Sequence, residues 1–296
     1  MLDQYLSGQV SRVSPEAPVP VVQVKQDIYR LGGAANVAHN ISSLIGESML
    51  IGSVGQDSNA ETLEDLCSEK GVRFFSAVGF HPTTLKTRVI ADKQQIARLD
   101  FESPSEDQSG QDLAIKTLFD HHLGDASLIV VSDYGKGMLS DAVLSHIITS
   151  SFEKGIQVLV DPKRVDWEAY RGATLISPNF KEFKAAAGAE FPNEDSAIEA
   201  VGKELRKHYQ IEHLLVTRSE KGMSLISENE VSHIPTEAKE VFDISGAGDT
   251  VIAALAVGLS KGMSFKESAS LANKAAGIVI AKFGTAVVSA DEIDLK

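Results

Sequence analysis

Short apolar segments alternate with helix-like segments through the middle of this 296-residue chain, and this alternation restricts the possible folds more than any other feature. Segments typical of buried strands occur at 128–132, 158–161, 174–177 and 214–217. Helix-like patterns lie between them, for example at 141–153 and 193–209. Strands that are buried on both faces and separated by helices are typical of a parallel sheet covered by helices. The pattern predicts one α/β domain, residues 1–296, with a mostly parallel central sheet flanked by helices.

The first third of the chain has a different strand pattern. Residues 18–24 are rich in proline and valine, which suits a strand at the edge of a sheet. Residues 83–91 and 96–101 flank the polar segment 92–95, and together they predict a β-hairpin. We expect these strands, within 9–26 and 80–102, to form a small separate sheet that acts as a lid over a site. The polar segment 102–111 then serves as a connector.

The strongest local signal for chemistry is the segment 243–250, Asp-Ile-Ser-Gly-Ala-Gly-Asp-Thr, which follows a strand-like stretch at 240–242 and opens an apolar helix at 251–259. The first N–H groups of a helix have no partner within the helix and favour an anion. The small residues Gly246, Ala247 and Gly248 let a phosphate approach these groups. Asp249 then lies beside the anion, where its carboxylate can accept a proton from an attacking hydroxyl. The same residues also fit a tight turn in which Asp249 only caps the helix.

Two weaker motifs also precede helices. Gly32 and Gly33 lead into a helix at 37–44, and Asn36 offers both a donor and an acceptor to a polyol. On its own this motif fits a closely packed helix start better. Asn179 and Glu182 follow the strand at 174–177 and lie one helical turn apart, where they can order a hydrated Mg²⁺ beside phosphates. On its own this second motif fits a capping box better, with Asn179 as the N-cap.

Composition and missing signatures argue against several classes of protein. The net charge of −13 makes the chain a poor binder of nucleic acid or of an anionic membrane. The sequence contains no P-loop, no protein-kinase signature and no dinucleotide-binding glycine motif. The eight histidines have no metal-ligand spacing, so we expect no metal bound directly by the protein.

Location and redox state also follow from the sequence. Cys67 is the single cysteine, so no internal disulfide can form, and its place in an amphipathic helix at 63–70 predicts a buried, unreactive thiol. No apolar run approaches the ~20 residues of a membrane span, and the first residues have no secretory-signal pattern. We therefore expect a cytoplasmic protein.

The three motifs, in this order along the chain, resemble the signatures of the ribokinase-like (PfkB-type) carbohydrate kinases. The resemblance extends over essentially the whole chain and implies an ATP-dependent, Mg²⁺-dependent sugar kinase. Other segments resemble one subgroup, which phosphorylates the C1 hydroxyl of D-glycero-β-D-manno-heptose 7-phosphate on the route to ADP-heptose and lipopolysaccharide core. These segments are 11–22, 94–102, 132–137, 170–179 and 216–225.

The resemblance implies a role for each matching residue. Asp249 is then the base, and Gly246, Ala247 and Gly248 form the anion hole for the transferred phosphoryl group. Asn179 and Glu182 organise Mg²⁺ through phosphates and water. The implied nucleotide contacts are Thr217, Arg218, Ser219, Gly222 and, near the adenine, Asn273. The implied sugar contacts are Asp3, Gly32, Gly33 and Asn36, and Asp243 lies near the monovalent-cation loop of some relatives.

A phosphate on the sugar would need basic partners in or near the lid. The candidates are Lys86, Arg88, Arg98, Lys136 and Lys163. Arg88 and Arg98 share a face of the hairpin only if they pair directly or sit an even number of residues off register. Any one of these residues also fits a solvated surface charge.

Two departures from the family pattern accompany the resemblance. Relatives begin with a core strand that would lie upstream of Met1, so we expect this strand to be missing. Many relatives continue into a C-terminal nucleotidyltransferase, which a sequence ending at Lys296 does not encode. Relatives commonly dimerise through their lid strands, and we expect a homodimer here. The alternatives are a related kinase for ribose, fructose or a hexose phosphate, and a non-catalytic sugar-binding regulator.

Overall fold

The computed structural model describes residues 1–79, 81–92, 94–102, 109–238, 240–282 and 284–295. Within these residues the strands form a six-stranded sheet, a four-stranded sheet and a two-stranded sheet. No helix in the described part of the chain is long and apolar enough to cross a membrane.

The six-stranded sheet is the centre of the body, and its strand order is β12-β11-β10-β9-β8-β7. The strands β7 to β10 are parallel, as predicted, whereas β11 and β12 add an antiparallel edge. The strand bounds are β7 (Leu128–Ser132), β8 (Gln157–Asp161), β9 (Leu175–Ile176), β10 (His213–Thr217), β11 (Met223–Ile226) and β12 (Val231–Ile234).

Successive side chains of the central strands enter two different apolar cores. Leu214 and Val216 of β10 belong to one cluster, and Leu215 between them belongs to the other. This alternation follows from the two-residue repeat of a strand that is covered on both faces. The first core is shared with α3 (Ser109–His122), α4 (Asp141–Glu153), α5 (Phe180–Ala187) and α6 (Asp195–His208). The second is shared with α1 (Ala34–Ile45), α7 (Ala247–Ser260) and α8 (Phe265–Val279).

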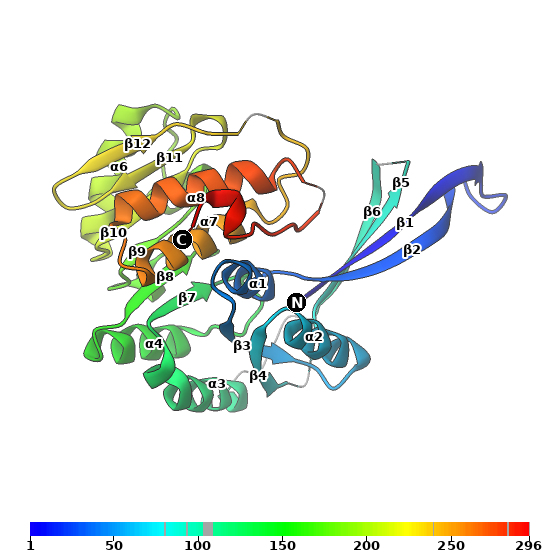
Figure 1. Ribbon diagram of the computed structural model, residues 1–296, viewed down its shortest axis with the longest axis horizontal. Coiled ribbons are helices and arrows are strands. Elements are labelled where there is room, and N and C mark those ends of the chain that lie inside the picture. The colour runs from blue at the N-terminus through cyan, green and yellow to red at the C-terminus, as the bar shows by residue number, and fades with distance from the viewer. Residues whose placement is uncertain (80, 93, 103–108, 239, 283, 296) are drawn as a thin grey trace.

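The four-stranded sheet contains the strands that were expected to form a lid and is called the lid below. It projects from one side of the rest of the molecule, which is called the body (Figure 1). Its order is β2-β1-β5-β6, so that β2 lies at an edge, as its prolines predicted. β5 and β6 form the expected antiparallel hairpin, although Lys93 in the predicted turn and residues 103–108 of the predicted connector lie outside the described residues. The bounds are β1 (Leu2–Val13), β2 (Pro20–Leu31), β5 (Leu85–Ala91) and β6 (Gln94–Phe101).

A largely apolar cavity of about 380 Å³ lies between the six-stranded sheet and the two-stranded sheet. That sheet consists of β3 (Ser48–Val54) and β4 (Val72–Val78), which are parallel. Residues 49–51 of β3 and 128–131 of β7 line the cavity together with α1, α3 and α7. Among the described residues β3 pairs only with β4, and β7 pairs only with β8. The cavity therefore separates two strands that each have an unpaired edge.

Two local predictions need correction, and one is confirmed. Residues 240–242 form no strand, because the N–H groups of Phe242 and Asp243 both donate to the Ile280 carbonyl and the apolar side chains there are exposed. The strand predicted at 174–177 is reduced to Leu175–Ile176. Cys67 is buried on α2 (Ser58–Glu69), and burial raises the pKa of its thiol to about 11, so it is unreactive as predicted.

Candidate active site

Asp249 lies in the first turn of α7 and is 6% exposed. Asn36 donates a hydrogen bond from Nδ2 to its Oδ2 at 2.7 Å, and the Tyr134 hydroxyl donates to its Oδ1 at 2.6 Å. Burial raises the pKa of Asp249, and these two hydrogen bonds oppose part of that rise. The carboxylate is thus held at both oxygens and has the raised proton affinity that suits a general base.

Of the two glycines before Asp249, only Gly246 is required by space and backbone conformation. Gly246 is the N-cap of α7 with φ of 79°, and a Cβ there would lie 2.9 Å from Nδ2 of Asn36. Gly248 differs, because a Cβ at that position would have no neighbouring atom within 4 Å. The surface above Gly248 is therefore open. The Ala247 N–H, in contrast, donates to the Ile244 carbonyl at 3.2 Å.

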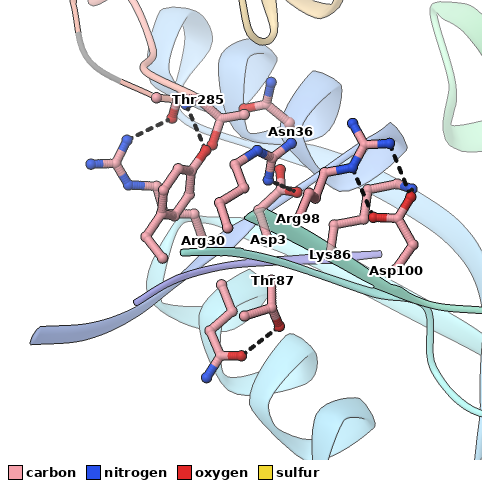
Figure 2. A network of polar contacts seen from close by, with 12 residues as sticks. Asp3, Arg30, Asn36, Lys86, Thr87, Arg98, Asp100 and Thr285 are labelled. Carbon is pink, nitrogen blue, oxygen red and sulfur yellow. Dashed lines mark hydrogen bonds and ion pairs between the residues drawn. The ribbon is translucent and has the colours of Figure 1, made fainter. Parts of the chain in front are cut away.

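The residues implied as sugar ligands lie where the lid joins the body. Asp3 is 3% exposed and pairs with Arg88, whose Nη1 lies 2.6 Å from Asp3 Oδ1. A Cβ on Gly32 would lie 2.7 Å from Asp3 Oδ2, so a larger residue there would displace the Asp3 carboxylate. Gly33 has φ of 56° and immediately precedes α1, which carries Asn36. Figure 2 shows Asp3 and Asn36 close to the lid strands, as a site between lid and body requires.

The implied nucleotide residues come together at the carboxyl ends of β9 and β10. Asn179 forms a parallel bridge with Thr217, and the Thr217 N–H donates to the Pro178 carbonyl at 2.9 Å. Asn179 and Glu182 form the capping box of α5, with both reciprocal hydrogen bonds present. Ligands of parallel α/β sheets bind outside the carboxyl ends of the strands. Capping does not exclude the predicted Mg²⁺ role, because the carboxylate of Glu182 stays partly exposed.

Two implied nucleotide residues have structural partners instead. Arg218 is 1% exposed, and its guanidinium bonds to Asn193, Asp195 and Ser224. In this arrangement its side chain holds the loop before α6 and is not available to a nucleotide. Asn273 is also buried, and its Nδ2 donates to the Pro235 carbonyl at 2.8 Å. The turn at Ser219 and Gly222 has positive φ at both residues, and a Cβ on Gly222 would collide with the Ile234 carbonyl oxygen.

Three of the five basic residues proposed for a sugar phosphate form one cluster with the carboxylates of Asp100 and Glu102. Arg88 and Arg98 are direct partners across the hairpin, so the register condition is met. Lys86 and Arg98 both pair with Asp100, as Figure 2 shows. Lys86 also reaches Glu102, and Lys136 lies 2.5 Å from the same carboxylate. Lys136 thereby links the body to the lid.

Lys163 does not join this cluster. Its Nζ lies 3.9 Å from Oε1 of Glu182, on the side of the implied nucleotide residues. Arg88 is also committed elsewhere, because it neutralises the buried Asp3. Of the five candidates, Lys86, Arg98 and Lys136 therefore make up the cluster between lid and body.

The structure adds two residues that sequence reasoning did not assign to the site. Tyr134 and Asp161 each lie at or just beyond the carboxyl end of a parallel strand, β7 and β8 respectively. Burial raises the pKa of Asp161 well above its usual range, and the charges of Asp249 and Glu182 raise it further. Their position at the carboxyl ends of predicted strands was the sequence feature that could have assigned them to the site.

Asp243 closes a loop beside the site. Its carboxylate accepts hydrogen bonds from the N–H groups of Ser245 at 2.9 Å and Gly284 at 3.0 Å. Burial opposes ionisation of Asp243, but these bonds and the charge of Arg88 outweigh burial and hold its pKa below the usual range. Thr285 continues this loop to the lid, since its N–H donates to the Tyr5 hydroxyl.

A comparison with known protein families gives a match to the pfkB family carbohydrate kinase over residues 4–292. The chain belongs to the pfkB family of carbohydrate kinases. Membership implies use of ATP and a sugar, and it accounts for the joint occurrence of the motifs around Asn36, Asn179 and Asp249.

Curated relatives and solved structures agree with this assignment. The kinase is 46% identical to proteins named "Bifunctional protein HldE" from Haemophilus influenzae (strain PittEE) and Pasteurella multocida (strain Pm70), over 99% of its own length. It spans 61% of the length of those relatives.

The solved structures share the fold at low sequence identity. Escherichia coli phosphofructokinase-2 in complex with potassium aligns with a TM-score of 0.83 at 19% identity, covering 99% of this chain and 94% of that one. Thermotoga maritima ribokinase aligns with a TM-score of 0.74 at 18% identity, covering 99% and 95%.

Proposed function

We propose that this kinase transfers the γ-phosphoryl group of ATP to the C1 hydroxyl of D-glycero-β-D-manno-heptose 7-phosphate. The product is the 1,7-bisphosphate, an intermediate on the route to ADP-heptose and lipopolysaccharide core. The observation that carries the proposal is the buried Asp249 carboxylate at the start of α7, held by Asn36 and Tyr134. The heptose as acceptor is supported by the subgroup segments and by the 46% identity to the HldE proteins.

In the proposed reaction Asp249 takes the proton of the C1 hydroxyl as that oxygen attacks the phosphoryl group. The N–H groups at the start of α7 stabilise the charge that develops on the phosphoryl oxygens. The partly exposed carboxylate of Glu182 supplies oxygen donors of the kind that Mg²⁺ and its bound waters prefer, which fits the cofactor that the family implies. When bound, Mg²⁺ neutralises charge on the triphosphate.

The 7-phosphate lies in this proposal against Lys86, Arg98 and Lys136. These residues pair with Asp100 and Glu102 in the structure. A dianionic phosphate would replace those carboxylates as the partner of the basic side chains. Because Lys136 belongs to the body and Arg98 to the lid, one phosphate bound by both would hold the lid closed. Such remote binding energy should appear in kcat/KM.

The proposal is tested by Mg²⁺-dependent release of ADP with a panel of acceptors: heptose 7-phosphate, free heptose, ribose, fructose and fructose 6-phosphate. We expect heptose 7-phosphate to have the highest kcat/KM, and Asp249→Asn controls for contaminating kinases. A higher value for ribose, fructose or fructose 6-phosphate would support the alternative of a related sugar kinase. A non-catalytic regulator would bind sugar without releasing ADP, which the intact Asp249 environment argues against.

We also propose that the kinase is a cytoplasmic homodimer formed through the lid. The lid carries exposed apolar side chains that a second lid could cover. They include Val24, Ile28, Ile96, Leu99 and Phe101. Light scattering after size exclusion should give twice the monomer mass, and Leu99→Glu should give the monomer. A monomeric wild-type protein at micromolar concentration would contradict the proposal.

The loop that contains Asp243 is proposed as a monovalent-cation site. Its ionised, hydrogen-bonded carboxylate supports this, as does the potassium complex of phosphofructokinase-2. Replacing K⁺ by tetramethylammonium at constant ionic strength should lower the rate if the site is used. An unchanged rate would contradict the proposal of a monovalent-cation site in this loop.

The cavity between β3 and β7 is proposed as the place of the core strand that the family resemblance puts upstream of Met1. Two unpaired strand edges and an apolar lining support this. Adding an apolar strand with a short linker before Met1 should raise the midpoint of thermal unfolding. The same addition with prolines in the strand cannot pair and is the matched control. Equal unfolding midpoints for the two would contradict the proposal.

A further inference from the structure

Tyr134 reaches the catalytic carboxylate from a turn that is fixed at both sides. The turn follows β7, and its Asp133 carboxylate accepts hydrogen bonds from the Gly135 N–H at 2.7 Å and the Tyr170 hydroxyl at 2.6 Å. Asp133 is buried, and Arg164 also pairs with it. These contacts leave the residue between Asp133 and Gly135 little freedom.

The ring of Tyr134 is also positioned by packing. A Cβ on Gly33 would lie 3.3 Å from Cε2 of Tyr134, so the ring lies directly against the glycine that precedes α1. The hydroxyl then meets Oδ1 of Asp249 at 2.6 Å, opposite the contact of Asn36 with Oδ2. The two donors come from different parts of the chain and together fix the plane of the carboxylate.

We propose that Tyr134 is a positioning residue that orients the Asp249 carboxylate and sets its proton affinity for the transfer from the sugar hydroxyl. The inference rests on the proposed role of Asp249 as base and extends it to the residue that controls the base. A donor on each oxygen stabilises the ionised form of a carboxylate and opposes the rise in pKa that burial causes.

The charged groups around Tyr134 and Asp249 determine how loss of the Tyr134 hydroxyl should change the pKa of Asp249. Burial raises the pKa of Tyr134, and the charges of Asp249, Asp161 and Asp3 raise it further, so its hydroxyl remains a donor at every working pH. Loss of this donor would therefore raise the pKa of Asp249. The surrounding groups are Asp3 on β1 with its partner Arg88 on β5, Asp161 on β8, Glu182 on α5 and Lys163 after β8.

The first test compares Tyr134→Phe with the wild type, because phenylalanine keeps the ring against Gly33 and removes only the donor. We expect the acidic limb of the kcat/KM profile to move up by about one pH unit, the size of shift that one hydrogen bond to a charged group produces. The KM for ATP should not change. Tyr29→Phe, which removes a hydroxyl bonded to Gln4 on the lid, is the matched control and should keep the wild-type profile.

The second test does not depend on turnover with any sugar. The carboxyl carbon of Asp249 is followed by NMR in protein labelled with ¹³C-aspartate, and Asp249→Asn assigns its signal. The titration midpoint should be higher in Tyr134→Phe than in the wild type. Incorporation of 3-fluorotyrosine at position 134 makes the hydroxyl a stronger donor and should lower the midpoint.

The outcomes separate this inference from the proposed function. Equal midpoints in the wild type, Tyr134→Phe and the fluorotyrosine protein would overturn the role of Tyr134, whichever sugar is the substrate. Shifted midpoints together with failure to phosphorylate heptose 7-phosphate would retain that role and reject the heptose as the acceptor. If Tyr134→Phe fails to fold, the fluorotyrosine protein decides the question alone.

Discussion

The two ends of this site are built in opposite ways. At the α7 end, Asp249 is 6% exposed and both of its oxygens accept a hydrogen bond from a buried or half-buried donor. At the lid end, Arg98 has a side chain that is 51% exposed, and it shares Asp100 with Lys86. Contacts in a dry, fixed environment contribute far more than contacts between solvated charges. The first end is therefore suited to chemistry, and the second to recognising and holding a charged group that arrives from solution.

The largest effect should come from removing the base. We expect Asp249→Asn to lower kcat by ~10²–10⁴-fold, because the amide keeps the shape of the side chain but cannot accept the proton. ATP binding, measured by calorimetry, should be nearly unchanged. A variant that kept more than about a tenth of the wild-type kcat would show that Asp249 is not the base. The α7 end would then not be the part of the site that performs the chemistry.

The next largest effect should come from the open start of α7. Gly248→Val should lower kcat by roughly 10²-fold, as loss of an anion-hole donor does, and should lower sugar affinity less. The fold should survive, because a Cβ at Gly248 meets no atom within 4 Å. Gly124→Val is a matched control, since a Cβ there also meets nothing within 4 Å and the residue is remote from the site. Equal losses of binding and turnover, or altered circular dichroism, would contradict this prediction.

The lid end should affect selectivity more than rate. We expect wild-type kcat/KM for heptose 7-phosphate to exceed that for free heptose by at least ~100-fold, roughly 2.7 kcal/mol. Arg98→Ala should remove much of this difference and leave the rate with free heptose almost unchanged. Lys25→Ala, at an exposed lid lysine bonded to Gln9, is the matched control. Comparable wild-type values for the two sugars would favour a ribokinase-like or fructokinase-like enzyme.

How much of the molecule could be predicted from its sequence depends on whether a feature is formed by neighbouring or by distant residues. The parallel sheet was predictable because residues such as Leu214 and Leu215 are apolar on both faces of one strand, a local signal. The turn at Gly246 that opens α7 was predictable because it is formed by residues adjacent in the sequence. The partnership of Tyr134 with Asp249 was not predictable, because it joins residues 115 positions apart.

Tertiary contacts decide the structure in two places where the local pattern does not. Arg218 lies in a segment that resembles a nucleotide-binding strand and turn. Its side chain is buried and donates hydrogen bonds to Asn193 and Asp195. Residues 240–242 have strand composition but no neighbouring strand to pair with among the described residues. Arg218 bonds to Asn193, and Phe242 donates to the Ile280 carbonyl, so both arrangements depend on contacts between segments that are distant in the sequence.

The smallest predicted effect is on salt dependence, and it tests the comparison most directly. Raising the salt concentration from ~0.05 M to ~0.5 M shortens the Debye length from about 14 Å to about 4 Å, which screens exposed charges and leaves buried ones almost unaffected. We expect kcat/KM for heptose 7-phosphate to fall several-fold, because Lys86, Arg98 and Lys136 are partly solvated. With free heptose the value should change little, since that reaction depends on Asp249 and the start of α7. The Arg98→Ala variant should lose most of the salt dependence along with its selectivity. A salt effect of equal size on both sugars would mean that the two ends of the site do not act separately.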